Sequence, residues 1–164
     1  MSSPALVQFR DMVREDLILT NLTAASRDDA LTQMASTLVE SGLCTPEFPA
    51  AILQREHEHP SALPMEGHKI AIPHTDAEHV IDSTIMFARL TRPVFFQAMG
   101  SPEKRIPVRL ISMFALRESS MIGDLLETLI TAYQDNKLLN DLLYARSRRE
   151  IFTLLQRAMD GEGR

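Results

Sequence analysis

The alternation of apolar and polar positions along the chain predicts five helices. Between Ser26, a residue that favours helix starts, and Gly42, a residue that favours helix ends, apolar side chains recur every three or four positions. A second helix is expected over 45–59, with Thr45 as its N-cap and Pro46 in its first turn. Three more apolar stripes, interpreted as core, make the last third of the chain helical, over 122–133, 138–143 and 151–158.

Short apolar runs rich in β-branched residues predict four strands. They lie at 16–24, 69–73, 83–90 and 107–116. The segment "MGSPEKRIP" (99–107) is expected to be a turn between the last two. Helices both precede and follow the strands, which predicts an α/β (α+β) fold with a single-layer mixed β-sheet flanked by helices. One domain is expected over 1–164, with a frayed tail at 160–164.

Composition restricts the class of protein and its partners. The 164 residues are 45% hydrophobic and 24% charged, as in an ordinary globular domain. The net charge of -5 gives no general attraction to phosphate backbones, so nucleic acid is not expected as a partner. The apolar runs are too short to cross a bilayer, and charges interrupt the N-terminus where a signal peptide is apolar. We therefore expect a cytoplasmic protein without membrane insertion, and interpret its single cysteine, Cys44, as an inert structural thiol.

All five histidines of the chain fall within residues 55–80. A catalytic zinc helix needs two histidines four residues apart with a glutamate between them, whereas these follow one another after two, nine, six and five residues. Prolines interrupt the window, and no cysteine is present in it to complete a structural zinc site. The chain also has no G-x-S-x-G, G-x-x-x-x-G-K-[ST] or G-x-G-x-x-G motif. No metal and no cofactor is expected, and an enzyme that handles phosphate here would have to receive it from another protein.

The stretch "KIAIPHTD" (69–76) places one histidine at the end of a predicted strand. Pro73 ends the strand pairing, so His74 is presented on a rigid backbone beside the hydroxyl of Thr75. A neutral imidazole has one unprotonated nitrogen that can attack a phosphoryl group when the other nitrogen is anchored. Arg55, Ser61 and Thr75 are candidate donors for the phosphoryl oxygens. From spacing alone, a solvated loop histidine stays open as the alternative.

Several stretches carry a resemblance to a known family. They are "IAIPHTD" (70–76), "LQREHEHPSAL" (53–63), "MGSPEKRIPVRLISMFALR" (99–117) and "LLETLITAYQDNKLLNDLL" (125–143). Together they resemble the enzyme IIA domain of the fructose–mannitol class (PTS EIIA type-2) in the bacterial phosphoenolpyruvate–sugar phosphotransferase system. The second stretch is similar to the galactitol-type branch. The match covers about residues 15–158, which the resemblance implies as the core of the domain.

The resemblance implies a phosphoryl relay. His74 matches the family's phosphoacceptor and Arg55 matches the family arginine near it, with Pro73, Ser61 and Thr75 expected to support the site. The domain is expected to accept the phosphoryl group from the histidine-containing phosphocarrier protein and pass it to a cysteine of a separate IIB protein. The link to a membrane permease, and so to sugar or polyol uptake, is indirect.

Two positions depart from the family pattern. Ala62 stands where a glycine is usual, and Ile122 occupies a place where many relatives have a polar residue early in a helix. His59 and His79 are the candidates to replace that helper group. The remaining polar residues of the window are interpreted as solvated surface, namely Glu56, Glu58, His57 and His68.

Three other hypotheses stay open at this point. A regulatory IIA-like binding module would accept phosphate and change partner binding through the added charge instead of feeding a transporter. A degenerate member of the fold would not be phosphorylated. A small metal-binding domain would purify with stoichiometric zinc or nickel.

Overall fold

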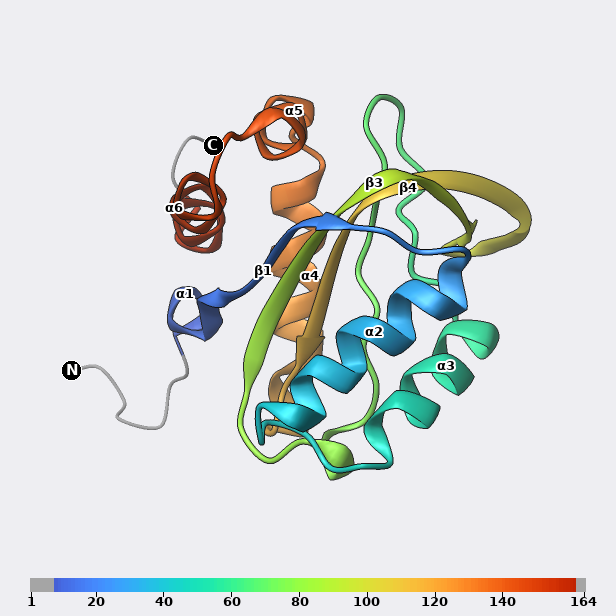
Figure 1. Cartoon of the computed structure of the whole chain (residues 1–164), viewed down its shortest axis with the longest axis vertical. Coiled ribbons are helices and arrows are strands. Elements are labelled where there is room, and N and C mark those ends of the chain that lie inside the picture. Colours follow the sequence, from blue (N-terminus) through green and yellow to red (C-terminus); the bar gives the residue numbers. More distant parts are fainter. Residues whose placement is uncertain (1–7, 162–164) are drawn as a thin grey trace.

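A four-stranded mixed sheet runs through the middle of the protein, in the order β1-β3-β4-β2 (Figure 1). The structure is a computed structural model that describes residues 8–161. Its strands are β1 Val13–Leu22, β2 Ile70–Ala71, β3 Thr84–Ala98 and β4 Ser101–Ala115. β3 and β4 form an antiparallel hairpin, while β1 and β2 pair in parallel with its two outer sides. The predicted mixed sheet is confirmed.

Helices cover both faces of the sheet. They are α1 Phe9–Met12, α2 Arg27–Glu40, α3 Phe48–Glu58, α4 Ile122–Tyr133, α5 Asn136–Tyr144 and α6 Arg148–Met159, with short 3-10 helices at η1 Ala77–His79 and η2 Ser119–Met121. Figure 1 shows α2 and α3 on one face and the three C-terminal helices on the other. In the part of the chain that the structure describes, no helix is both long and apolar enough to span a membrane.

Each face of the sheet has its own hydrophobic cluster. Successive side chains of a strand point to opposite faces. In β3, Met86 and Ala88 therefore join the cluster beneath α2 and α3, whereas Ile85 and Phe87 join the cluster beneath α4, α5 and α6. Because both faces are covered, the central strands are buried on both sides and read as continuous apolar runs.

Two helix starts were predicted with different success. Ser26 caps α2, since its hydroxyl oxygen accepts a hydrogen bond from the Asp29 N–H at 3.1 Å. Thr45 does not cap α3, which begins after Glu47. The backbone N–H of Thr45 donates instead to the His79 carbonyl, at 2.9 Å, so this residue belongs to a pairing with the segment before β3. Its buried hydroxyl oxygen has no hydrogen-bond partner among residues 8–161.

The turn predicted over 99–107 was wrong in its length. The chain turns at Met99 and Gly100, where glycine has a φ of 77°, and β4 begins directly afterwards. The paired strands then include Pro107, which lies opposite Phe95. β2 pairs with β4 only at Leu110 and Ile111, so the outer edge of β4 has no regular strand partner at Pro107 within residues 8–161. Proline is tolerated there because no N–H is needed for pairing on that edge.

The segment between α3 and β2 is tied into the sheet at Ala62. This residue is fully buried and bridges both Ala71 and Ala98. A second isolated bridge joins Cys44, before α3, to Val80, between η1 and β3. Of the predicted frayed tail, residues 162–164 lie outside the described part of the chain, as do residues 1–7 of the N-terminal stretch.

Candidate functional site

His74 lies just beyond β2, held by two contacts. Its Nδ1 is 3.1 Å from the carbonyl oxygen of Ile72. A carbonyl oxygen can only accept, so Nδ1 carries the proton and donates. The imidazole is stacked on the Phe114 ring with 4.5 Å between ring centroids and 12° between their planes. These two contacts fix both the tautomer and the plane of the ring, and leave Nε2 unprotonated when the ring is neutral.

The electrostatic surroundings favour the neutral imidazole. Burial lowers the pKa of His74 below 6.5, and the positive charge of Arg55 lowers it further. The hydrogen bond to Ile72 and the charge of Asp76 oppose this shift. Desolvation is the largest of these effects, so at neutral pH Nε2 carries a lone pair that can act as a nucleophile.

Arg55 reaches the same site from the last turn of α3. Its Nη1 is 3.7 Å from Oδ1 of Asp76, two residues after His74. Its Nε is buried and has no hydrogen-bond partner among the described residues 8–161. The structure thus brings a guanidinium group with an unused donor to the histidine that follows β2.

The predicted supporting residues have different surroundings. Thr75 is buried directly after His74, and the Pro73 carbonyl accepts from the Phe114 N–H at 3.2 Å, which ties the end of the β2 segment to β4. Ser61 is also buried, but its hydroxyl contacts Oε1 of Glu56 at 2.6 Å. Its assignment to phosphate stays a prediction, because in this arrangement the hydroxyl is engaged by a carboxyl group.

The five histidines, close together in sequence, contact different parts of the protein. His59 ends α3 at the surface and its charge acts on His74. His79 lies in η1 with its Nε2 3.6 Å from Glu78. The other two contact distant elements: His57 pairs with Asp28, at 3.2 Å, and His68 contacts Asn140, at 3.0 Å. Within residues 8–161 no three histidine, cysteine or acidic side chains are placed to hold a metal ion.

Glu56 is the residue whose environment the sequence interpretation missed. It was expected on a solvated helix face together with Glu58, but it is only 2% exposed. The spacing of the buried residues of α3 contained the signal: Phe48, Ile52 and Glu56 follow one another at intervals of four and form one buried stripe. Burial raises the pKa of Glu56 to about 7.

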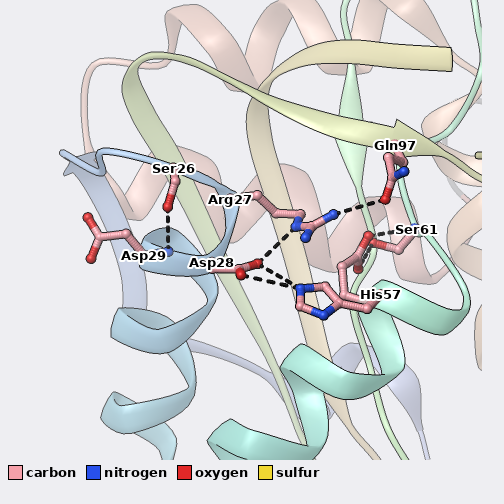
Figure 2. A network of polar contacts seen from close by, with 8 residues as sticks. Ser26, Arg27, Asp28, Asp29, His57, Ser61 and Gln97 are labelled. Carbon is pink, nitrogen blue, oxygen red and sulfur yellow. Dashed lines mark hydrogen bonds and ion pairs between the residues drawn. The ribbon is translucent and has the colours of Figure 1, made fainter. Parts of the chain in front are cut away.

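A polar network lies where α2 begins and α3 ends (Figure 2). Arg27 donates from Nε to Asp28, at 3.0 Å, and from Nη1 to Gln97 of β3, at 3.2 Å. Asp28 also contacts His57. The positive charges of Arg27 and His57 lower the pKa of Glu56 and so partly offset the rise that burial causes. The network therefore joins α2, α3 and the β3–β4 hairpin beside the candidate site.

The two departures from the family pattern are both packed into the protein. Ala62 occupies the double bridge described above, where its side chain is fully buried. Ile122 is the first residue of α4 and packs, half-buried, against the cluster beneath the C-terminal helices. Position 122 therefore supplies no polar group.

Comparisons with known proteins follow the same segments. The family "Phosphoenolpyruvate-dependent sugar phosphotransferase system, EIIA 2" matches residues 11–158. The galactitol-specific EIIA component of the phosphotransferase system of Escherichia coli is 26% identical over 126 residues, which is 77% of this chain and 83% of that protein.

Solved structures show the same fold. Enzyme IIAMTL of Escherichia coli, determined in a complex with phosphorylated enzyme IIBMTL, has a TM-score of 0.70 at 26% identity and covers 85% of this chain and 94% of its own. The nitrogen regulatory protein IIA-Ntr of Neisseria meningitidis has a TM-score of 0.71 at 23% identity, with 89% and 97% of the two chains covered. The family match spans nearly all of the described residues. The chain belongs to the EIIA 2 family of the phosphoenolpyruvate-dependent sugar phosphotransferase system, as its motifs predicted.

Proposed function

We propose that this chain carries a phosphoryl group on Nε2 of His74 as a component of a sugar phosphotransferase system. The observation that supports the proposal is the state of the imidazole. Its Nδ1–H is anchored on the Ile72 carbonyl, its pKa is lowered, and its other nitrogen is unprotonated. A nucleophile for phosphoryl transfer needs this combination of a free lone pair and a fixed direction.

The proposed reaction is a displacement at phosphorus. Nε2 of His74 forms a bond to phosphorus as the bond between phosphorus and the donor's histidine nitrogen breaks, and the electron pair of that bond stays on the donor. In the second transfer a cysteine thiolate of the acceptor forms the new bond and the P–N bond on His74 breaks. Nε2 supplies the electron pair for the first step and recovers it when the P–N bond breaks, so Nδ1 keeps its proton in both steps. Its hydrogen bond to the Ile72 carbonyl stabilises the ring while it is phosphorylated.

Arg55 is proposed to bind the phosphoryl oxygens. A guanidinium group presents donors in a planar fork that suits phosphate. The Nε of Arg55 has no partner among residues 8–161, and its contact with Asp76 is long, at 3.7 Å. The arginine is therefore available to redirect its donors when a phosphoryl group arrives. Thr75 and the nearby backbone amides are the further proposed donors, and His59 is proposed as a helper through its charge.

The proposed partners are the histidine-containing phosphocarrier protein as donor and a IIB protein as acceptor. Support for the acceptor comes from the similar enzyme IIAMTL, whose structure was solved with phosphorylated enzyme IIBMTL. The buried Cys44 of this chain has a pKa raised to about 12 and lies at the bridge to Val80, so the acceptor thiol is expected on another chain.

The first test is phosphorylation in vitro followed by intact mass. Purified protein is incubated with phosphoenolpyruvate, enzyme I and the phosphocarrier protein, with His74→Ala alongside and a known IIA as a positive control. We expect an acid-labile gain of one phosphoryl group in the wild type and no gain in the variant. No gain in the wild type, under conditions that phosphorylate the control, contradicts the proposal.

The regulatory alternative differs in the second transfer. The nitrogen regulatory protein shares the fold at 23% identity, which by itself shows no function. A transport component passes its phosphoryl group to a IIB cysteine, whereas a regulatory module keeps it and changes its affinity for a partner. Mixing the phosphorylated protein with IIB proteins from the same genome, and following phosphate on cysteine, distinguishes the two.

A further inference from the structure

The last turn of α3 contains a buried carboxyl group that the proposed reaction does not use. Both oxygens of Glu56 contact one residue: the Ser61 hydroxyl lies 2.6 Å from Oε1, and the Ser61 N–H donates to Oε2 at 2.9 Å. Removing a carboxyl group from water is costly unless its oxygens are hydrogen-bonded. The two contacts therefore hold Ser61 at a defined place relative to α3.

Ser61 in turn fixes the strand that leads to His74. The Ser61 carbonyl accepts from the Ile72 N–H at 3.1 Å, and the Leu63 N–H donates to the Ile70 carbonyl at 3.0 Å. Together with the Ala62 bridge, these bonds make the segment 61–63 a short antiparallel partner of β2. β2 has only two residues of its own, so this partner supplies much of its support.

Ile72 connects this pairing to the imidazole. Its N–H is bonded to Ser61 and its carbonyl accepts from Nδ1 of His74. A shift of Ser61 therefore moves the acceptor that selects the tautomer of His74. Three consecutive contacts, Glu56 to Ser61, Ser61 to Ile72 and Ile72 to His74, run from α3 to the candidate nucleophile.

We infer that Glu56 is a positioning residue of the phosphoryl-transfer site, acting on His74 through Ser61 and Ile72. The inference rests on the proposed function of His74. Glu56 contacts neither the reacting nitrogen nor the phosphoryl group. It keeps the Ile72 carbonyl in line with Nδ1, so that Nε2 faces outward with its lone pair. The preceding residue on α3 is Arg55, so the same anchor also fixes the point from which that guanidinium group reaches the site.

The test uses two substitutions of Glu56 and one matched control. In Glu56→Gln the amide oxygen can accept from the Ser61 N–H while the amide nitrogen donates to the Ser61 hydroxyl oxygen, so both contacts are kept. In Glu56→Ala both are lost. Glu58→Ala is the control, because Glu58 lies two residues further on the same helix, is exposed, and contacts only Gln54 among the hydrogen bonds and ion pairs of the described residues.

The primary measurement is the tautomer of His74, read from the ring nitrogen shifts in ¹⁵N–¹H correlation spectra. We expect the Nδ1–H form in the wild type, Glu56→Gln and Glu58→Ala, and a mixture of both tautomers in Glu56→Ala. The second measurement is the initial rate of phosphorylation by the phosphocarrier protein. We expect a decrease of roughly tenfold to a hundredfold in Glu56→Ala, the range that misplacement of a reacting group produces. Glu56→Gln should restore the rate to near the wild-type value.

An unchanged tautomer and an unchanged rate in folded Glu56→Ala overturn the inference, as does a loss in Glu56→Gln as large as in Glu56→Ala. If far-UV circular dichroism shows Glu56→Ala unfolded, Ser61→Ala decides: it removes one of the two contacts, and unchanged ring shifts contradict the inference. The tautomer measurement needs no phosphoryl donor. A wild type that is never phosphorylated, combined with the expected tautomer change, therefore removes the proposed function but supports the link from Glu56 to His74.

Discussion

At His74 the protein combines burial with a single directed hydrogen bond. Burial lowers the pKa because the charged imidazolium is poorly solvated, while the Ile72 carbonyl stabilises the same charge and raises it. Stacking on Phe114 covers one face of the ring without offering a hydrogen bond to Nε2. The side chain is therefore neutral yet oriented, which is the state that a nitrogen nucleophile requires near neutral pH.

The lowered pKa of His74 predicts a pH dependence of stability with a definite sign. The folded state binds the proton less tightly than the unfolded state, whose pKa is near 6.5. The contribution of His74 to stability is therefore fully present above 6.5 and is lost as the pH falls through the folded-state pKa. We expect the unfolding free energy of the wild type to fall more steeply between about pH 7 and 5 than that of His74→Gln. Urea titrations at each pH measure this, and equal slopes contradict it.

Glu56 works in the opposite direction and supplies the control. Its pKa is raised from 4.5 to about 7, so its contribution is present below 4.5 and is lost as the pH rises through about 7. The same titrations carried out in a Glu56→Gln background remove this second group. In that background, the unfolding free energy should still fall more steeply with decreasing pH when His74 is present than in His74→Gln.

At the level of single residues, the sequence was most informative where a motif spans consecutive positions. "IAIPHTD" led to His74 and "LQREHEHPSAL" led to Arg55, and the structure brings these two residues together. The burial of Glu56 was missed because a charged residue in a window of polar side chains is most often solvated. The engagement of Ser61 was missed for a different reason: a side-chain contact between residues five apart is decided by how the helix ends.

Among the elements, α5 depends on an arginine from another part of the chain. Nη1 of Arg89, in β3, donates to the carbonyls of Leu142, Leu143 and Ala145, at 3.1, 3.1 and 2.8 Å, and Nε donates to Thr20. The last carbonyls of a helix have no partners within it. A fixed cation at this end also complements the helix dipole. Arg89 therefore joins the end of α5 to the sheet.

We predict that Arg89→Lys lowers the unfolding free energy by about 2 kcal/mol. Hydrogen bonds of charged groups contribute about 1.5–3 kcal/mol each, and the ammonium group cannot reproduce the planar fork that serves α5 and β1 together. The control is Arg92→Lys, three residues later on an exposed stretch of the same strand. It should change the unfolding free energy by less than about 0.5 kcal/mol. Urea unfolding followed by circular dichroism measures both. Equal effects of the two substitutions contradict this role of Arg89.

The loop before β2 needs glycine at position 67. Its φ is 85°, and a Cβ built on it lies 2.3 Å from Oδ1 of Asn136, the atom that accepts from the His68 N–H. Gly67→Ala should destabilise the protein more than Gly42→Ala, because Gly42 has a similar φ of 76° but nothing within 4 Å of its Cβ. We expect the unfolding free energy to fall by about 1 kcal/mol in Gly42→Ala and by about 2–3 kcal/mol in Gly67→Ala. Thermal unfolding compares them, and equal losses show that the Asn136 contact is unimportant.

Helices were easier to predict than strands. The stripes over 122–133, 138–143 and 151–158 correspond to α4, α5 and α6, because packing against the sheet selects apolar residues at helical spacing. The β3–β4 hairpin was predicted too short, since its outer half alternates buried and exposed residues and contains prolines, so it resembles a turn in composition. Its length is set by cross-strand pairing, which no local pattern records.

For the whole molecule, one sheet carries two hydrophobic clusters. Neighbouring residues of β3 and β4 belong to different clusters, so the same strands carry both. Disruption of either cluster therefore disturbs the strands on which the other cluster is built. This arrangement favours a single cooperative unfolding transition.

We predict that large-to-small substitutions on either side reduce the stability of the whole protein. Met34→Ala in α2 and Leu129→Ala in α4 each remove a fully buried side chain, from different clusters. Each should cost about 2–5 kcal/mol and leave one transition in urea, with the same midpoint by circular dichroism and tyrosine fluorescence. A two-step curve for Leu129→Ala would show that the C-terminal helices unfold separately.

The bridge between Cys44 and Val80 has a practical consequence for labelling chemistry. The only thiol in the sequence is 2% exposed, and burial raises its pKa to about 12. Maleimides and disulfide reagents attack thiolates, so they should spare the native protein and react only when this part of the chain opens. A cysteine introduced at the exposed Phe95 would then be the single dye attachment point, without any need to replace Cys44.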